Sequence, residues 1–194
     1  MRVGPPLRVS PVTLVLVAAF SLGCGAGASA GPEATGSGGE SGSGGAGVFI
    51  AFASDFQGYD GWRRLDLGVV PPTDNELPGP RALYVNRAPE HGASEFPVGT
   101  MIVKAIETGA PSEWQMFAMV KRGGGFNYVG ARGWEWFELT QTDDRRVAVQ
   151  WRGVAPPSGM GYGAGTQGGV CNTCHAGSAA NDYVIGDDLS LSGF

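Results

Sequence analysis

The residues with the clearest chemistry are Cys171 and Cys174, which form the sequence Cys-Asn-Thr-Cys-His together with His175. Two thiols three positions apart lie on one side of a helical turn, where they can add to the two vinyl groups on one edge of a porphyrin. The adjacent histidine then points toward the porphyrin iron. The spacing therefore predicts one covalently bound haem c, attached through Cys171 and Cys174, with His175 as the iron ligand.

Two other kinds of site share part of this pattern. A Cys-x-x-Cys pair alone could be a redox dithiol or half of a zinc site. A zinc site needs a second pair of ligands, but the other histidine is His91 and the other cysteine is Cys24, close to the N-terminus. The sequence favours haem over both alternatives.

The residue opposite His175 decides which chemistry a haem site of this kind supports. A methionine or histidine in that position favours electron transfer, whereas an open position admits a substrate or a diatomic gas. The candidates for a sixth ligand are His91, Met101, Met116, Met119 and Met160. Met160 lies in an irregular loop shortly before the motif and is the best electron-transfer ligand among them, but nothing in the sequence requires six ligands.

Two charged residues interrupt the apolar pattern of the predicted strands. Alternation places Lys104 on an isoleucine-bearing face of the segment 100–107, and Glu135 on a Phe- and Leu-bearing face of the segment 133–140. Either charge would be costly if it were buried without a partner. The two residues could form an ordinary ion pair or face solvent. Alternatively, Lys104 could be a desolvated amine near the iron, with Glu135 as a carboxylate that moves protons.

Short segments rich in Val, Ile, Trp, Phe and Tyr predict β-strands. They cover residues 82–86, 100–107, 114–121, 134–140 and 146–151, and turn residues separate them. The stretch Val48–Leu67 is expected to form a helix that enters the sheet. We therefore expect a mainly β (α+β) domain: an antiparallel β-sheet with short flanking helices and a C-terminal haem-binding segment.

The N-terminal segment indicates export. Arg2 and Arg8 precede an apolar run that is far shorter than the ~20 residues a membrane-spanning helix needs. The run ends in Ser-Leu-Gly-Cys, which predicts a lipoprotein signal peptide over residues 1–23 and lipidation of Cys24. Cleavage after Ala30 is the alternative. A Gly-, Ala- and Ser-rich tether then spans residues 24–47 and leaves a single domain at 48–194.

Composition narrows the possible partners. The formal net charge is −5 and there is no basic stripe, which argues against a nucleic-acid partner. Contact with a membrane is expected through the lipid anchor alone. The expected location is the bacterial periplasm or outer membrane.

Several segments of the predicted domain together resemble a known family. They are RALYVN at 81–86, FPVGTMIVK at 96–104, residues 116–122, Trp134-Glu135-Trp136, and Cys171–His175 followed by Asn181-Asp182-Tyr183-Val184. They resemble the cytochrome P-460 family, which includes the cytochromes c′-beta, over about residues 48–186. The resemblance implies a dimeric, antiparallel β-sheet haem protein with five-coordinate iron.

The resemblance also implies roles for individual residues. A strand lysine of cytochrome P-460 is linked covalently to the haem, and the matching residue here is Lys104. The carboxylate that relays protons would be Glu135, and Phe56, Phe96, Phe117 and Phe126 are possible lining residues. The implied activity is oxidation of hydroxylamine or a related small nitrogen compound, with electrons passed to a partner cytochrome. The alternatives are a gas-binding protein of the cytochrome c′-beta type, which binds nitric oxide, and an electron-transfer cytochrome c.

Overall fold

The computed structural model describes residues 47–72, 76–157, 159–160 and 171–194. These residues belong to a compact unit that spans residues 42–194. The predicted signal peptide (1–23), its lipidation site Cys24, the alternative cleavage site after Ala30 and nearly all of the tether (24–47) lie outside the described residues. No helix among the described residues has the length and apolar character that crossing a membrane requires.

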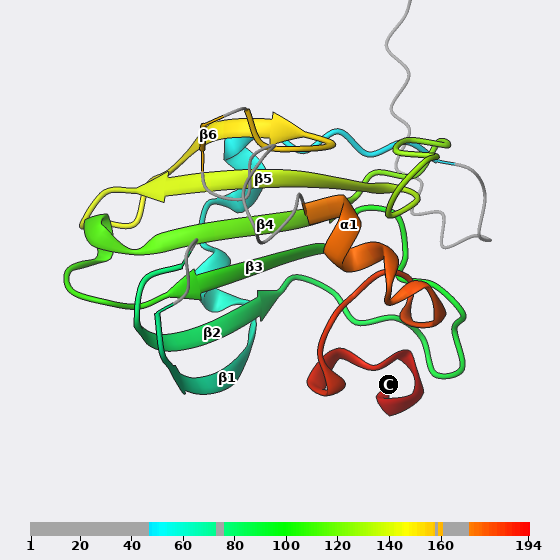
Figure 1. Ribbon diagram of the computed structural model, residues 1–194, viewed down its shortest axis with the longest axis horizontal. Helices are drawn as coiled ribbons and strands as arrows, with labels where there is room; N and C mark the ends of the chain where they lie inside the picture. Colours follow the sequence, from blue (N-terminus) through cyan, green and yellow to red (C-terminus); the bar gives the residue numbers. More distant parts are fainter. Residues whose placement is uncertain (1–46, 73–75, 158, 161–170) are drawn as a thin grey trace, which may run out of the picture. The chain divides into compact units, whose positions relative to one another are not determined.

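One antiparallel sheet forms the framework of this unit (Figure 1). Its strands follow the order of the chain: β1 (Arg63–Val70), β2 (Gly79–Val85), β3 (Met101–Ile106), β4 (Gln115–Lys121), β5 (Trp134–Gln141) and β6 (Val147–Gly153). Each strand is hydrogen-bonded to the strand that follows it in the chain, so the sheet is an antiparallel meander. The predicted mainly β, antiparallel class is confirmed.

The segment before the sheet differs from the prediction. The expected helix over Val48–Leu67 is replaced by two single 3₁₀ turns, η1 (Ala53–Phe56) and η2 (Tyr59–Gly61), and by the start of β1. Gly58 separates the two turns with a left-handed φ of 69°, a conformation that ends a right-handed helix. Strand β1 is an edge strand with largely exposed side chains, so it lacks the apolar alternation by which a strand is recognised.

Short helices account for the rest of the regular structure. The 3₁₀ turn η3 (Pro111–Glu113) lies between β3 and β4. The C-terminal part contains α1 (Cys171–Ala176), η4 (Ala179–Asn181), η5 (Asp187–Leu189) and η6 (Leu191–Gly193). The helix α1 and the C-terminal end lie over the same face of the sheet (Figure 1).

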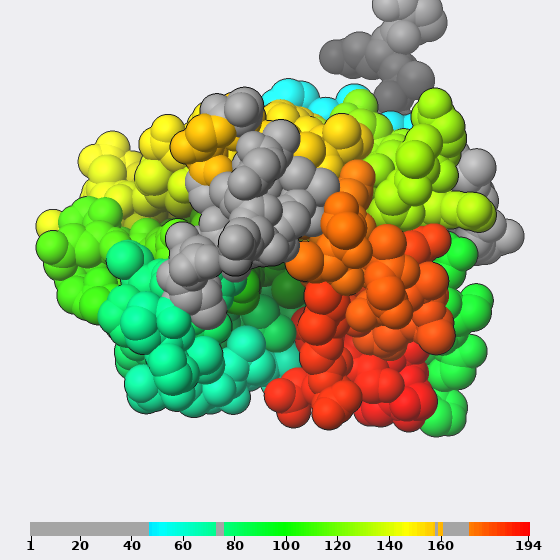
Figure 2. Space-filling model, viewed as in Figure 1, coloured from blue at the N-terminus to red at the C-terminus, as the bar shows by residue number. Residues whose placement is uncertain are grey.

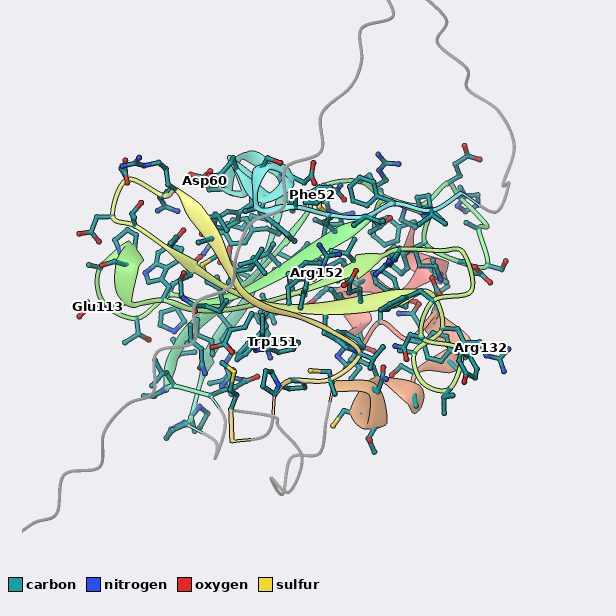
Figure 3. The ribbon with its side chains drawn as sticks, turned by 90° about the horizontal axis from the view of Figure 1, so that it is seen from above. Phe52, Asp60, Glu113, Arg132, Trp151 and Arg152 are labelled. Atoms are coloured by element: carbon teal, nitrogen blue, oxygen red, sulfur yellow. The ribbon has the colours of Figure 1, made fainter. Side chains whose placement is uncertain are left out.

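Both faces of the sheet are covered, and each carries its own apolar cluster. The N-terminal face contains Phe56, Tyr59, Tyr84, Val103, Met116, Val120, Phe137 and Leu139, packed with η1 and η2. The α1 face contains Leu83, Ile102, Met119, Trp134, Trp136, Trp151, Val184 and Leu189. Figure 3 shows the alternation directly, because the neighbouring residues Trp151 and Arg152 of β6 project to opposite sides of the sheet.

Candidate functional site

A pocket of about 420 Å³ lies on the α1 face, between the sheet and the C-terminal segment. Its apolar lining includes Leu67, Val70, Leu83, Ile102, Phe117, Met119, Trp136, Val184, Ile185 and Leu189. Figure 2 shows the surface hollowed between β1 and β2 on one side and the C-terminal segment on the other. The volume lies in the range of ordinary cofactor and ligand sites.

The helix α1 brings all three residues of the predicted attachment motif to this pocket. Cys171, Cys174 and His175 line it together. Cys171 is half-buried, and burial raises the pKa of its thiol to about 11. The Cys171 thiol is therefore protonated at neutral pH, which argues against a reactive thiolate at this position.

The His175 imidazole is held in one tautomer. Its Nδ1 lies 2.6 Å from the Tyr183 carbonyl oxygen, which can only accept a hydrogen bond. Nδ1 therefore carries the ring proton and donates a hydrogen bond to that oxygen. The ring packs on Trp136, with the ring centroids 4.5 Å apart. Burial lowers the pKa of His175, which keeps the imidazole neutral. The remaining nitrogen, Nε2, keeps its lone pair for a metal.

An asparagine inside the motif anchors α1 to the loop between β4 and β5. Asn172 Oδ1 accepts hydrogen bonds from Trp136 Nε1 (3.0 Å) and Asn127 Nδ2 (2.6 Å), and Asn172 Nδ2 donates to Asn127 Oδ1 (2.8 Å). Gly130 allows this close packing, because a Cβ at that position would lie 2.5 Å from Asn172 Cγ. The spacer residue of the motif therefore has a structural role that the motif itself does not reveal.

A buried ion pair lies next to the turn that carries the histidine's acceptor. Lys121 Nζ is 2.5 Å from Asp182 Oδ1, and both side chains are nearly inaccessible. Burial raises the pKa of Asp182, while the Lys121 ammonium and the Phe96 N–H act in the opposite direction. Asp182 and Tyr183 both adopt left-handed φ values, 49° and 66°.

Lys104 lines the pocket. Its Nζ pairs with Glu76 Oε1, and it lies 5.8 Å from the centroid of the Phe117 ring. Arg81, which also lines the pocket, binds the other carboxylate oxygen of Glu76 at 2.9 Å. The pocket lining therefore includes two cations that bind the buried Glu76 carboxylate, and one acidic residue, Asp188.

Glu135 does not reach the pocket. Its strand alternation was predicted correctly, since it lies on the side of β5 that bears Phe137, but that side belongs to the N-terminal face. Glu135 Oε1 accepts a hydrogen bond from Arg152 Nε (2.8 Å), and Oε2 contacts Arg152 Nη2 (2.7 Å) and Arg122 Nη1 (3.2 Å). The structure thus separates Glu135 from Lys104 by the thickness of the sheet.

The candidate sixth ligands are also distributed over both faces. Met101 and Met116 belong to the cluster on the N-terminal face. Met119 lines the pocket, whereas Met160 packs against the cluster on the α1 face without lining the pocket. His91 is exposed, and its Nδ1 lies 2.8 Å from the Phe194 carbonyl oxygen.

Of the four phenylalanines that were predicted as possible lining residues, one lines the pocket and three do not. Phe117 lines the pocket, whereas Phe56 lies in the cluster on the N-terminal face and Phe96 packs against Trp134 in the cluster on the α1 face. Phe126 lies under the Arg122 guanidinium, 4.3 Å from it.

Sequence reasoning missed three carboxylates on the pocket side, of which Asp188 lines the pocket itself. Glu76 lies in the connection between β1 and β2, where no periodic pattern assigns it a face. Glu138 is paired with Phe117, which is itself paired with Lys104, so all three lie on the same face of the sheet. Glu138 Oε2 accepts a hydrogen bond of 2.6 Å from Trp151 Nε1. Only the strand register reveals that Glu138, rather than Glu135, lies on the side of Lys104.

The residues of the pocket fit a haem. Two cysteines and a neutral histidine stand at one wall, and the rest of the lining is largely apolar. The buried Arg81 Nε has no hydrogen-bond partner among the described residues. Arg81 and Lys104 are cationic donors in the pocket lining, which suit a porphyrin propionate, while Glu76 and the lining residue Asp188 balance their charge.

Comparisons of the chain with protein-family models, with curated proteins and with solved structures gave no match.

Proposed function

We propose that this protein is an exported c-type haem protein that resembles cytochrome P-460 and oxidises hydroxylamine or a related small nitrogen compound. The observation that carries the proposal is that Cys171, Cys174, His175 and Lys104 line one apolar pocket. A pair of thiols and a histidine with an available Nε2 are what attachment of haem c requires.

Each residue of the pocket has a role that follows from its chemistry. Cys171 and Cys174 hold the cofactor, His175 Nε2 ligates its iron, and the apolar side chains exclude water from it. Bound haem supplies an iron that binds the nitrogen compound and accepts its electrons. Because this oxidation also releases protons, a proton acceptor is needed at the pocket wall. Asp188 lines the pocket, and it is the carboxylate we assign to that task in place of Glu135.

Lys104 is the residue through which the proposed activity can be separated from simple haem binding. The resemblance implies a covalent link between the lysine and the haem, and the Lys104 side chain lines the same pocket as the motif. A bound nitrogen compound must lose electrons to a second protein, for which a small partner cytochrome is the expected acceptor.

The test is a spectroscopic and mass-spectrometric comparison of the haem-loaded wild-type protein with Lys104→Arg and Lys104→Leu. We expect a wild-type haem peptide that contains Cys171–His175 joined to the peptide of Lys104, with measurable hydroxylamine oxidation. Lys104→Arg keeps the cation beside Glu76 but cannot form the link, so it should keep haem on both cysteines and lose the turnover. Absence of haem from Cys171 and Cys174 in the wild-type protein would overturn the proposal.

The apolar lining favours one second candidate, a gas-binding protein of the cytochrome c′-beta type. Apart from the region around Arg81 and Lys104, the pocket offers chiefly aliphatic and aromatic surface. Such a pocket binds nitric oxide without needing a proton acceptor. Haem held by Cys171 and Cys174 alone, with tight nitric oxide binding and no turnover of hydroxylamine, would select this function.

Export and anchoring are proposed from the sequence alone. A lipid on Cys24 and a tether over residues 24–47 would hold the haem domain at a membrane surface in the periplasm. Incorporation of labelled fatty acid that Cys24→Ala abolishes would establish the anchor, whereas a mature N-terminus at Gly31 would establish ordinary secretory cleavage.

A further inference from the structure

We infer that the buried ion pair of Lys121 and Asp182 positions the axial ligand His175 through the Tyr183 carbonyl. The inference rests on the proposed haem-binding function. It assigns a task to the second lysine of the chain, which lies away from the pocket wall formed by Lys104.

The ion pair is rigidly held. Lys121 Nζ lies 2.5 Å from Asp182 Oδ1, with side-chain exposures of 6% and 3%. The other carboxylate oxygen of Asp182 accepts a hydrogen bond from the Phe96 backbone N–H at 2.9 Å. Lys121 Nζ also lies 5.4 Å from the centroid of the Trp134 ring. The Asp182 carboxylate is thus bound from two separate parts of the chain, β4 and the segment before β3.

The backbone at Asp182 is fixed as firmly as its side chain. Trp134 Nε1 donates a hydrogen bond of 2.7 Å to the Asp182 carbonyl oxygen. Asp182 and the next residue, Tyr183, have left-handed φ values of 49° and 66°, which are unfavourable for residues with a Cβ. A backbone of this kind persists when its surroundings hold it in place. The contacts of Asp182 supply that restraint.

The ion pair is connected to the iron ligand through a single backbone carbonyl. The Tyr183 carbonyl follows directly after the restrained Asp182, and it accepts the Nδ1–H of His175 at 2.6 Å. A hydrogen bond from Nδ1 orients the imidazole and makes Nε2 a stronger donor to a metal. If the ion pair is lost, the turn can relax and the carbonyl can leave the histidine. A weaker Nε2 donor stabilises ferric iron less, so the midpoint potential should rise.

A purely structural role would have different consequences, and the chain offers a matched control. Glu135 is also a buried carboxylate in an ion pair, with 3% side-chain exposure, but it lies on the N-terminal face. Removing its charge should lower stability without changing the axial ligand. The contrast between the two carboxylates therefore separates positioning from general destabilisation.

The experiment compares haem-loaded Asp182→Asn and Lys121→Met with wild type and with Glu135→Gln. We expect Asp182→Asn and Lys121→Met to show a higher midpoint potential, a lower iron–histidine stretching frequency in the ferrous state, and about tenfold slower turnover. We expect Glu135→Gln to show the wild-type potential and stretching frequency. Unchanged values in a folded, haem-loaded Asp182→Asn protein would overturn the inference.

A milder variant covers the case in which those two proteins do not load haem. Lys121→Arg keeps the cation but changes its geometry, so it should shift the stretching frequency in the same direction by a smaller amount. The wild-type values in loaded Lys121→Arg would then count against the inference. A wild-type protein that carries no haem on Cys171 and Cys174 would instead contradict the proposed function.

Discussion

The two faces of the sheet both bury aromatic side chains and both enclose ion pairs, yet they differ in the space they leave. On the N-terminal face, Phe56 packs edge-on against Phe137, and the Arg152 guanidinium lies 4.8 Å from the centre of the Phe137 ring. On the α1 face, Lys104 and Arg81 stand beside a pocket of about 420 Å³.

The difference follows from what covers each face. Two short turns, η1 and η2, follow each other in the chain before β1 and pack directly on the N-terminal face. The α1 face is covered by α1 and the segment that continues to Phe194, and that segment lies beside the sheet with the pocket between them (Figure 1). Similar strands can therefore support a closed core on one side and a binding site on the other, because the covering segments decide which one forms.

The largest expected effect comes from shortening one buried aromatic side chain on each face. Trp136→Leu and Phe56→Leu each remove a buried ring, so each should lower the free energy of unfolding by about 2 to 3 kcal/mol, measured by urea denaturation. Only Trp136→Leu should change the haem absorption spectrum, because Trp136 lines the pocket, contacts His175 and donates a hydrogen bond to Asn172, whereas Phe56 does not line the pocket. An equal spectral change in Phe56→Leu would break the proposed division between the faces.

A pH effect should be specific to the N-terminal face. Tyr59 is fully buried and donates a hydrogen bond of 2.8 Å to Gln141, and burial raises its pKa to about 12. The unfolded chain releases this proton near pH 10. Stability that is present below about pH 10 should therefore be lost as the pH rises to about 12, by an amount of about 2 kcal/mol.

Tyr59→Phe tests this pH dependence. Its free energy of unfolding should be lower at neutral pH, because Gln141 loses a partner, and should fall less steeply between about pH 10 and 12. Urea denaturation across that range measures the two slopes. If the free energy of unfolding of Tyr59→Phe and of wild type fell equally steeply over this pH range, ionisation of Tyr59 would not be the cause of the pH dependence.

The smallest effect is expected at the loop that holds α1. In Gly130→Ala the new methyl group meets Asn172, so the loop and the helix must move apart, at a cost of about 1 kcal/mol. The haem spectrum should shift slightly with the helix. Gly61→Ala is the matched control, since a Cβ at Gly61 meets nothing within 4 Å. Equal stability losses in the two variants would contradict the anchoring role of Asn172.

Lys104 and Glu135 show which features of the site the sequence could predict and which it could not. The alternation in β3 and β5 correctly grouped Lys104 with isoleucine and Glu135 with phenylalanine, because side chains of a strand alternate whatever the fold. It did not reveal that the two groups lie on opposite faces. Both faces of this sheet are buried, so apolar neighbours did not distinguish one face from the other.

Strand β1 and Glu76 were not predicted, because neither lies in a periodic apolar pattern. Strand β1 carries Arg63, Arg64 and Asp66 at exposed positions. The aromatic-rich segment that precedes this strand was interpreted as a helix. Glu76 binds Lys104 and Arg81 from a position outside the strands, and no periodic pattern in the sequence could indicate this.

The sequence by itself determined the Cys171–His175 motif, the alternating strands and the turns between them, since all of these depend on residues that are close in the chain. Tertiary structure alone decided that Lys104 shares a pocket with the motif, that Glu135 lies behind the sheet, and that Lys121 binds Asp182. These relations depend on strand register and on which remote segment covers which face, and neither depends on local spacing.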